Sequence, residues 1–277
     1  MNILKKLFVV FILVASINTM AHAQNSSNVL TVNSINIPAD RLSITDSIAP
    51  DNKPVYLASF DIAVKDAEDT KSVILQLQTW LQENKMASLS LSMLNRNFEV
   101  AEERLYSNVS IQEIAWPAAD ATSRSAAKIS VKIKAGAVQI NYDTKNKIQV
   151  APVRAMAAMI SNYRFQLGSL PANRIAAISG LNAGNKSAQD FTIEVSMADA
   201  REWNLWLAAA KKSPGSSKKE QGSIALLTPD FKNTIMELGL KEVSIISYNF
   251  SSNSNDQSIA RVTIRLRAQS VTITNGK

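Results

Sequence analysis

The ten residues Ser125–Lys134, SAAKISVKIK, recur 133 positions later as Ser258–Arg267, SIARVTIRLR. In both stretches apolar residues alternate with polar or basic ones, which is the period of a β-strand with one buried face. Length, pattern and side-chain chemistry all agree between the two stretches. We therefore predict that the chain contains one β-rich domain of about 100 residues written twice.

Four further blocks repeat in the same order along the chain. They are Ile37–Leu42 with Leu170–Ile175, Phe60–Val64 with Phe191–Val195, Trp80–Lys85 with Trp206–Lys211, and Asn108–Ile111 with Glu242–Ile245. The period is much longer than that of a solenoid repeat, so the pattern indicates two tandem domains. We predict a first copy over residues 24–140, a connector over 141–162 and a second copy over 163–277.

Within each copy the alternating stretches are interrupted once by a helical period. Apolar residues from Val73 to Leu81, and from Trp203 to Ala210, recur at the spacing of one helix face. Trp80, Trp203 and Trp206 lie on these faces, so we expect them in the core and not on a ligand-stacking surface. The predicted fold class is mainly β (α+β): two tandem β-barrel or sandwich domains, each with one amphipathic helix packed on it.

The first 23 residues have the pattern of a signal peptide. Lys5 and Lys6 precede the apolar run Leu7–Ala15, and Ala21-His22-Ala23 is a small-x-small cleavage motif. Cleavage after Ala23 predicts an exported protein, periplasmic or extracellular. Since no later stretch approaches ~18 apolar residues, we expect no stable membrane insertion after cleavage.

Removal of this segment also removes the only histidine, His22, and the chain has no cysteine. Ser-His and Cys-His nucleophile pairs, His or Cys metal sites and disulfides are therefore excluded from the mature protein. No carboxylate pair has a matching arrangement in both copies; the acidic residues considered are Asp66, Glu68, Asp69, Glu102 and Glu103. We expect no enzymatic activity, no catalytic or metal site and no cofactor.

The repeated last strand carries a basic face. The residues are Lys128, Lys132 and Lys134 in the first copy and Arg261, Arg265 and Arg267 in the second. The net charge falls only from +7 to +5 when Lys5 and Lys6 leave. The simpler interpretation is the solvent face of a sheet; the alternative is a surface that lines a channel or meets an anionic partner. We expect no nucleic-acid partner.

A Pro-Ala-Asp/Asn-Arg motif also occurs in both copies. Pro38 and Arg41 return as Pro171 and Arg174. Proline ends a strand, and Asp or Asn can hydrogen-bond the local backbone. We interpret this motif as a repeated structural turn rather than a binding site.

The order of these elements resembles the tail-tube proteins of contractile phages and the tube protein of type VI secretion. The resemblance covers roughly residues 30–140 and 163–274. Its nearest local match is Pro171–Ile175 followed by Ile178–Leu181, where the first copy has Asp46-Ser47-Ile48 instead of Ser-Gly-Leu. The resemblance implies a β-barrel with a flanking helix that assembles into six-membered rings and tubes. Tandem duplications in this family form trimers with pseudo-sixfold symmetry.

Three functions follow as hypotheses. The first is a non-enzymatic exported structural protein that self-assembles into a ring or tube, as a homo-oligomer and with protein partners of an exported assembly. The alternative is a monomeric periplasmic or secreted module that binds an anionic polymer or protein through the basic strands. A carboxylate-based glycan hydrolase is the least favoured.

Overall fold

The computed structural model describes residues 28–142, 144, 146–148, 155–183, 187–213, 218–250 and 260–276. The predicted signal peptide and its cleavage site lie outside these residues. The predicted fold class is confirmed: two large antiparallel sheets dominate the structure, and one amphipathic helix accompanies each. Within the described residues, neither helix has the length and apolar character needed to cross a bilayer.

We call the part of the structure that contains the first sheet the first domain. Its strands are β1 (Asn28–Val32), β2 (Ile35–Pro38), β3 (Asp40–Ile48), β4 (Pro54–Ala63), β5 (Ala87–Leu94), β6 (Val100–Ala115), β8 (Lys128–Ala135) and β9 (Ala137–Tyr142). Helix α2 (Glu68–Glu83) joins β4 to β5. The strand order is β2-β1-β5-β6-β8-β4-β3, and β9 pairs with the first half of β6.

The second domain has the same arrangement. Its strands are β10 (Tyr163–Leu167), β11 (Ile175–Ser179), β12 (Gln189–Ser196), β13 (Glu220–Leu227), β14 (Thr234–Phe250), β15 (Arg261–Ala268) and β16 (Ser270–Asn275). A short 3-10 turn, η1 (Met197–Asp199), leads into helix α3 (Ala200–Lys212). The order β10-β13-β14-β15-β12-β11 matches β1-β5-β6-β8-β4-β3, and β16 pairs with β14 as β9 does with β6.

Sheet register corrects one of the predicted repeat blocks. Phe60 lies opposite Val131, and Ile193 lies opposite Ile264. Val131 and Ile264 are equivalent positions of the last repeated strand, so Phe60 corresponds to Ile193 and not to Phe191. The predicted match of Phe60–Val64 with Phe191–Val195 is therefore wrong by two positions. A shift of two keeps every side chain on its own face, so the alternating pattern cannot reveal it.

The helices differ in length, so their starts are 132 positions apart (Glu68 and Ala200) and their ends 129 (Glu83 and Lys212). Trp80 and Trp206 are 126 positions apart. At that offset the buried residues coincide: Ile74 with Ala200, Leu77 with Trp203 and Trp80 with Trp206. The match of Trp80–Lys85 with Trp206–Lys211 stays a prediction, and the two tryptophans point inward from equivalent helix faces.

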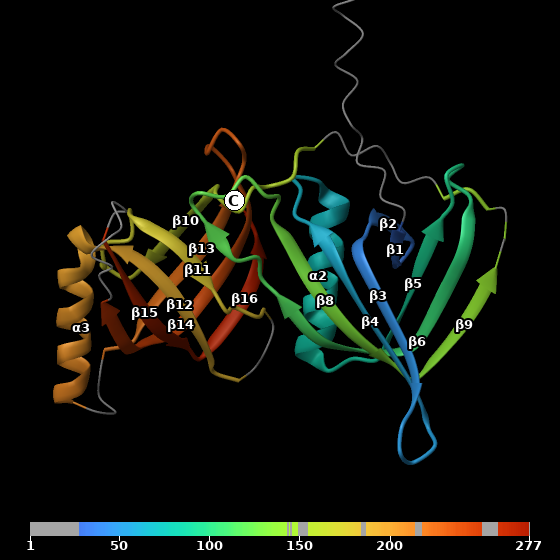
Figure 1. Cartoon of the computed structure of the whole chain (residues 1–277), viewed down its shortest axis with the longest axis horizontal. Coiled ribbons are helices and arrows are strands. Elements are labelled where there is room, and N and C mark those ends of the chain that lie inside the picture. The colour runs from blue at the N-terminus through green and yellow to red at the C-terminus, as the bar shows by residue number, and fades with distance from the viewer. Residues whose placement is uncertain are drawn as a thin grey trace, which may run out of the picture.

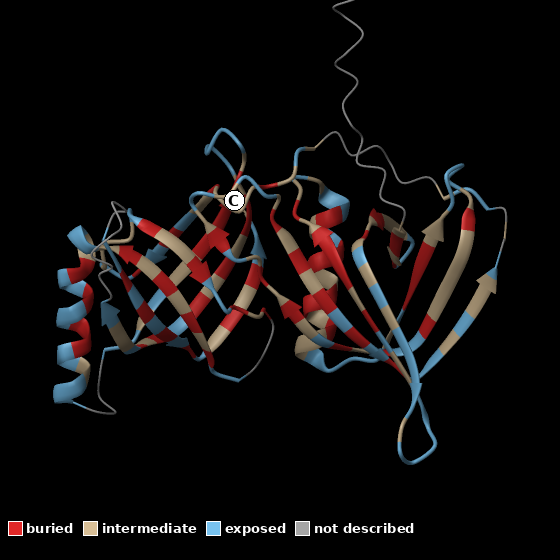
Figure 2. Ribbon diagram, in the orientation of Figure 1, coloured by how far each residue is buried: buried red, intermediate tan, exposed pale blue. Residues whose placement is uncertain are grey.

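The tryptophans are in the core, as predicted. Trp203 is fully buried, and Trp80 and Trp206 are at most 9% exposed. The indole N–H of Trp203 donates to the Pro171 carbonyl at 3.1 Å, and that of Trp206 donates to the Lys218 carbonyl at 3.1 Å. Figure 2 shows α3 with a buried face toward the second sheet and an exposed face on its outer side.

Candidate functional site: the contact between the two domains

The two domains lie side by side, with α2 between the two sheets (Figure 1). The described part of the predicted connector packs as an extended arm. Ala158 donates its N–H to the Val64 carbonyl at 2.7 Å and accepts from the Ala127 N–H at 2.7 Å. Asn162 then accepts from the N–H of Leu227 in the second domain at 2.8 Å. The connector therefore contacts both domains. Strand β9 ends at Tyr142 before it, and strand β10 begins at Tyr163 after it.

Gln78 connects α2 to the edge strand of the second sheet. Its side-chain N–H donates to the Ile273 carbonyl at 2.9 Å, and its side-chain oxygen accepts from the Ile273 N–H at 2.5 Å. Gln78 is 5% exposed and Ile273 is 1% exposed. One amide side chain thus pairs both the N–H and the C=O of Ile273, at an edge of the sheet where these groups need partners.

Replacing Gln78 with alanine is expected to lower the free energy of unfolding by about 1–3 kcal/mol, because the buried N–H and C=O of Ile273 lose their partners. Urea unfolding at low protein concentration measures this. Asn204→Ala, an exposed amide on α3, is the matched control and is expected to change stability by no more than about 0.5 kcal/mol. Equal effects of the two substitutions would show that the Gln78 bonds do not stabilise the domain contact.

The first domain also adds a strand to the second sheet. Strand β7 (Ala119–Asp120) pairs antiparallel with β11, on the side of β11 that faces away from β12. Just before it, the N–H of Trp116 donates to the Leu181 carbonyl at 2.9 Å, and Trp116 is 6% exposed. The contact therefore combines backbone pairing with burial of an aromatic side chain, as in strand addition between proteins.

The structure places the six basic residues of the repeated last strand on β8 and β15, at or next to the solvent. Five of them form ion pairs with acidic residues. The pairs are Lys128–Asp40 at 2.8 Å, Lys132–Glu113 at 2.6 Å, Arg261–Glu194 at 3.3 Å, Arg265–Asp190 at 2.6 Å and Arg267–Asp190 at 2.6 Å. Glu113, Asp190 and Glu194 come from strands directly beside β8 or β15, and Asp40 comes from β3, one strand further away. The face therefore offers an anionic ligand less net charge than the sequence indicates.

Asp190 gives this surface a pH dependence. Hydrogen bonds from Arg267 and then Arg265 hold the pKa of Asp190 below its usual 3.8. Because the folded pKa is lowered, its stabilisation is present above about pH 3.8 and is lost as the pH falls through the folded value. Asp190→Asn is expected to destabilise by about 1 kcal/mol or less at neutral pH and to have a smaller effect near about pH 2. A difference that is the same at both pH values would contradict the ion pair.

The Pro-Ala-x-Arg motif lies at a backbone irregularity in both domains. Pro38 ends β2, and Arg41 has a positive φ of 45° at a register shift in the β3–β4 pairing. Pro171 precedes a turn that contains Arg174. The guanidinium Nε atoms lie 3.7 Å from Asp61 and 4.0 Å from Asp199, respectively. The structural role of Pro38, Arg41, Pro171 and Arg174 stays a prediction.

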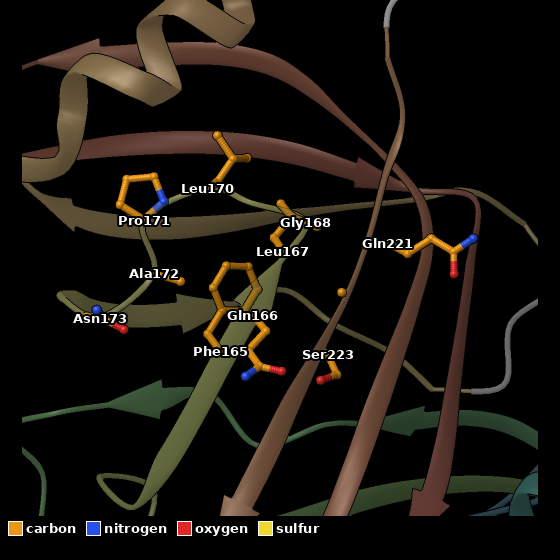
Figure 3. Close-up of a pocket in the computed structure, with 11 residues that line it drawn as sticks. Phe165, Gln166, Leu167, Gly168, Leu170, Pro171, Ala172, Asn173, Gln221 and Ser223 are labelled. Atoms are coloured by element: carbon orange, nitrogen blue, oxygen red, sulfur yellow. The ribbon is translucent and has the colours of Figure 1, made fainter.

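A cavity of about 460 Å³ lies in the second domain, between β10, the segment after it and β13 (Figure 3). Gly222 lets the strands approach here, because a Cβ at this position would lie 2.2 Å from the Gln166 carbonyl oxygen. The polar side chains that line the cavity are three amides and a hydroxyl: Gln166, Asn173, Gln221 and Ser223. They can hydrogen-bond an uncharged group, but none of the lining side chains is an acid or a base.

Three of the acidic residues considered in the sequence have polar partners of their own. Asp66 pairs with Lys71 at 2.6 Å, Glu102 with Arg104 at 2.5 Å, and Glu103 accepts from Asn141 at 3.3 Å. Over the described ranges of the chain, no group of three or more acidic side chains is placed to hold a metal ion.

No known protein family matches the chain, and no curated protein matches it. Among solved structures, the tube-terminating cap of the anti-feeding prophage is similar to it at 16% identity and a TM-score of 0.39. That alignment covers 48% of this chain and 97% of the cap protein. A chain of the sheath–tube complex of PVC, an extracellular contractile injection system, is similar at 15% identity and a TM-score of 0.33, over 43% of this chain and 90% of that one.

Sequence patterns alone do not indicate that Gln78, Trp116 and β7 make the domain contact. Gln78 is a polar residue beside Leu77 within the apolar stripe of α2, and this position indicates a polar partner, since a buried amide requires one. Nothing in the sequence identifies that partner, because Ile273 is 195 residues away.

Proposed function

We propose that this protein is a non-enzymatic structural protein that is exported and self-assembles through its two tube-like β domains into a ring or tube. The observation that supports this is the one-sided contact between the domains. The first domain contributes helix α2 and the short strand β7, and the second domain accepts them on β16 and β11. The second domain has a helix of its own, α3, at the end of the molecule away from the first domain.

A contact between two unlike surfaces does not close on itself. Repeated from chain to chain, it generates a ring if the rotation closes and an open filament if it does not. Three chains would supply six domains, so the proposed ring is a trimer with pseudo-sixfold symmetry. Stacked rings of this kind would form a tube.

Negative-stain electron microscopy of the protein purified without residues 1–23 tests this proposal. We expect ring-shaped particles with six similar lobes, alone or stacked. Compact two-lobed particles at every concentration would contradict it.

Export is the second part of the proposal. The full chain, expressed in a Gram-negative host, is expected to be recovered outside the cytoplasm with Gln24 as its first residue. Intact-mass measurement of the recovered protein checks the cleavage site. Recovery of the uncleaved chain from the cytoplasm would contradict export.

A further inference from the structure

The strand register identifies surfaces at the two ends of the molecule that match the contact between the domains. Trp116 follows β6, and Phe250 ends β14. Ala115 lies opposite Ser130 and Asn249 opposite Thr263, so the next residues, Trp116 and Phe250, are equivalent. Trp116 is 6% exposed beside the second domain, whereas Phe250 is 50% exposed. Among the described residues, the second domain thus has a half-exposed aromatic residue at this position.

The edge strands show the same difference on the opposite side of each domain. Arg104 lies opposite Ile140, and Leu238 lies opposite Ile273, so β9 is the counterpart of β16. Val271 and Ile273 of β16 are buried, at 2% and 1% exposure, and the backbone of Ile273 is hydrogen-bonded to Gln78 of α2. Val138 and Ile140 of β9 keep the apolar character but are only half-buried, and no residue of β9 is fully buried. Strand β9 therefore presents an apolar edge without a helix on it.

Helix α3 has an exposed face equivalent to the docking face of α2. At the offset of 126 residues, which superposes the buried residues of the two helices, Gln78 corresponds to Asn204, on the α3 face that also carries Ala208 and Lys211. These residues are exposed, and Leu205 beside them is 57% exposed. A solvent-facing helix surface with a leucine and two alanines (Ala208 and Ala209) is more apolar than solubility requires.

Strand β3 completes the match. It is the last strand of the first sheet and pairs only with β4, whereas its counterpart β11 is extended by β7. In Figure 1, α3 lies at one end of the molecule and β9 at the other. We name the surface formed by Met197, Asn204, Leu205, Ala208 and Phe250 the helix end, and the surface formed by β9 and the open edge of β3 the strand end.

We infer that the helix end of one chain docks on the strand end of a second copy of this chain, and so repeats between chains the contact that α2 and Trp116 make within one. The inference rests on the proposed self-assembly and names the surfaces that perform it. In this contact α3 covers Val138 and Ile140, and Phe250 is buried as Trp116 is. The partner is a second copy because the residues at each end match those already in contact within the chain.

The absence of cysteine from the sequence allows a direct test. Two single-cysteine variants, Ala208→Cys at the helix end and Asn141→Cys at the strand end, are mixed and treated with a bis-maleimide whose span is about two side chains. A double variant, Gln82→Cys with Thr274→Cys, joins α2 to β16 within one chain. It serves as a positive control for reagent reach, with the cross-link identified by peptide mass.

We expect a two-chain product in the mixture and none from either variant alone. A double variant that carries both Ala208→Cys and Asn141→Cys is expected to give a ladder that stops at three chains. A product from one variant alone would indicate contact between identical surfaces and would overturn the inference. Absence of cross-links in protein that still assembles would overturn the inference but leave self-assembly standing, whereas a strictly monomeric protein would contradict both.

Discussion

Replacing Trp203 with alanine is expected to lower the free energy of unfolding by about 3–5 kcal/mol, the largest effect of any single substitution considered. Trp203 is among the largest fully buried side chains, and it packs 6.2 Å from Trp206 between ring centroids. Its loss would leave a large cavity under α3 and the Pro171 carbonyl without its indole partner. Urea unfolding followed by circular dichroism measures the change.

Trp203→Phe keeps most of the aromatic volume but removes the N–H together with the rest of the five-membered ring, so it reduces the cavity that Trp203→Ala would leave. We expect this variant to lose roughly half as much stability or less, since a single hydrogen bond contributes about 1 kcal/mol. If Trp203→Ala changed stability by no more than an exposed substitution does, α3 would not be part of the core of the second domain.

The second large effect concerns assembly. Leu205→Glu combined with Phe250→Glu is expected to weaken association between chains at least about 100-fold, because two carboxylates would be buried in an apolar contact. Both residues are at least half exposed in the single chain, at 57% and 50%, so the fold of the monomer is expected to persist. Sedimentation velocity over a concentration series measures the association, and circular dichroism checks the fold.

The chain provides a matched control for this double variant. Phe98 and Phe231 are exposed at 48% and 57% and lie in the β5–β6 and β13–β14 loops, outside both docking surfaces. Phe98→Glu with Phe231→Glu introduces the same number of charges and removes comparable apolar area. We expect it to leave association within about threefold of the unmodified protein, a difference below 1 kcal/mol. If both double variants weakened association equally, a general charge effect would explain the result and the helix end would not be an interface.

The sequence predicted the elements well and their alignment less well. Alternation along the last repeated strand and the helical stripe around Trp80 and Trp203 follow from periodicity, which burial of one face imposes. Periodicity also conceals slips that preserve it. The Phe60 block is displaced by two residues, and its side chains stay on the same face.

The domain contact depends on information that local sequence does not contain. Gln78 has partners 195 residues away, and β7 is only two residues long, too short for any pattern to indicate. The basic strand was visible in the sequence, but its neutralisation was not, because Asp190 and Glu194 reach Arg267 and Arg261 only through the β12–β15 register. Which equivalent surfaces are covered and which are exposed depends on how the two domains lie in space, and the sequence repeat alone does not determine it.

The mass of residues 24–277 in solution tests the proposed self-assembly most directly. Sedimentation equilibrium of residues 24–277 over a wide range of concentration is expected to give a species of three chains, or larger multiples of three where rings stack. A single-chain mass maintained at the highest concentration reached would contradict self-assembly, and with it the role proposed for the helix end and the strand end.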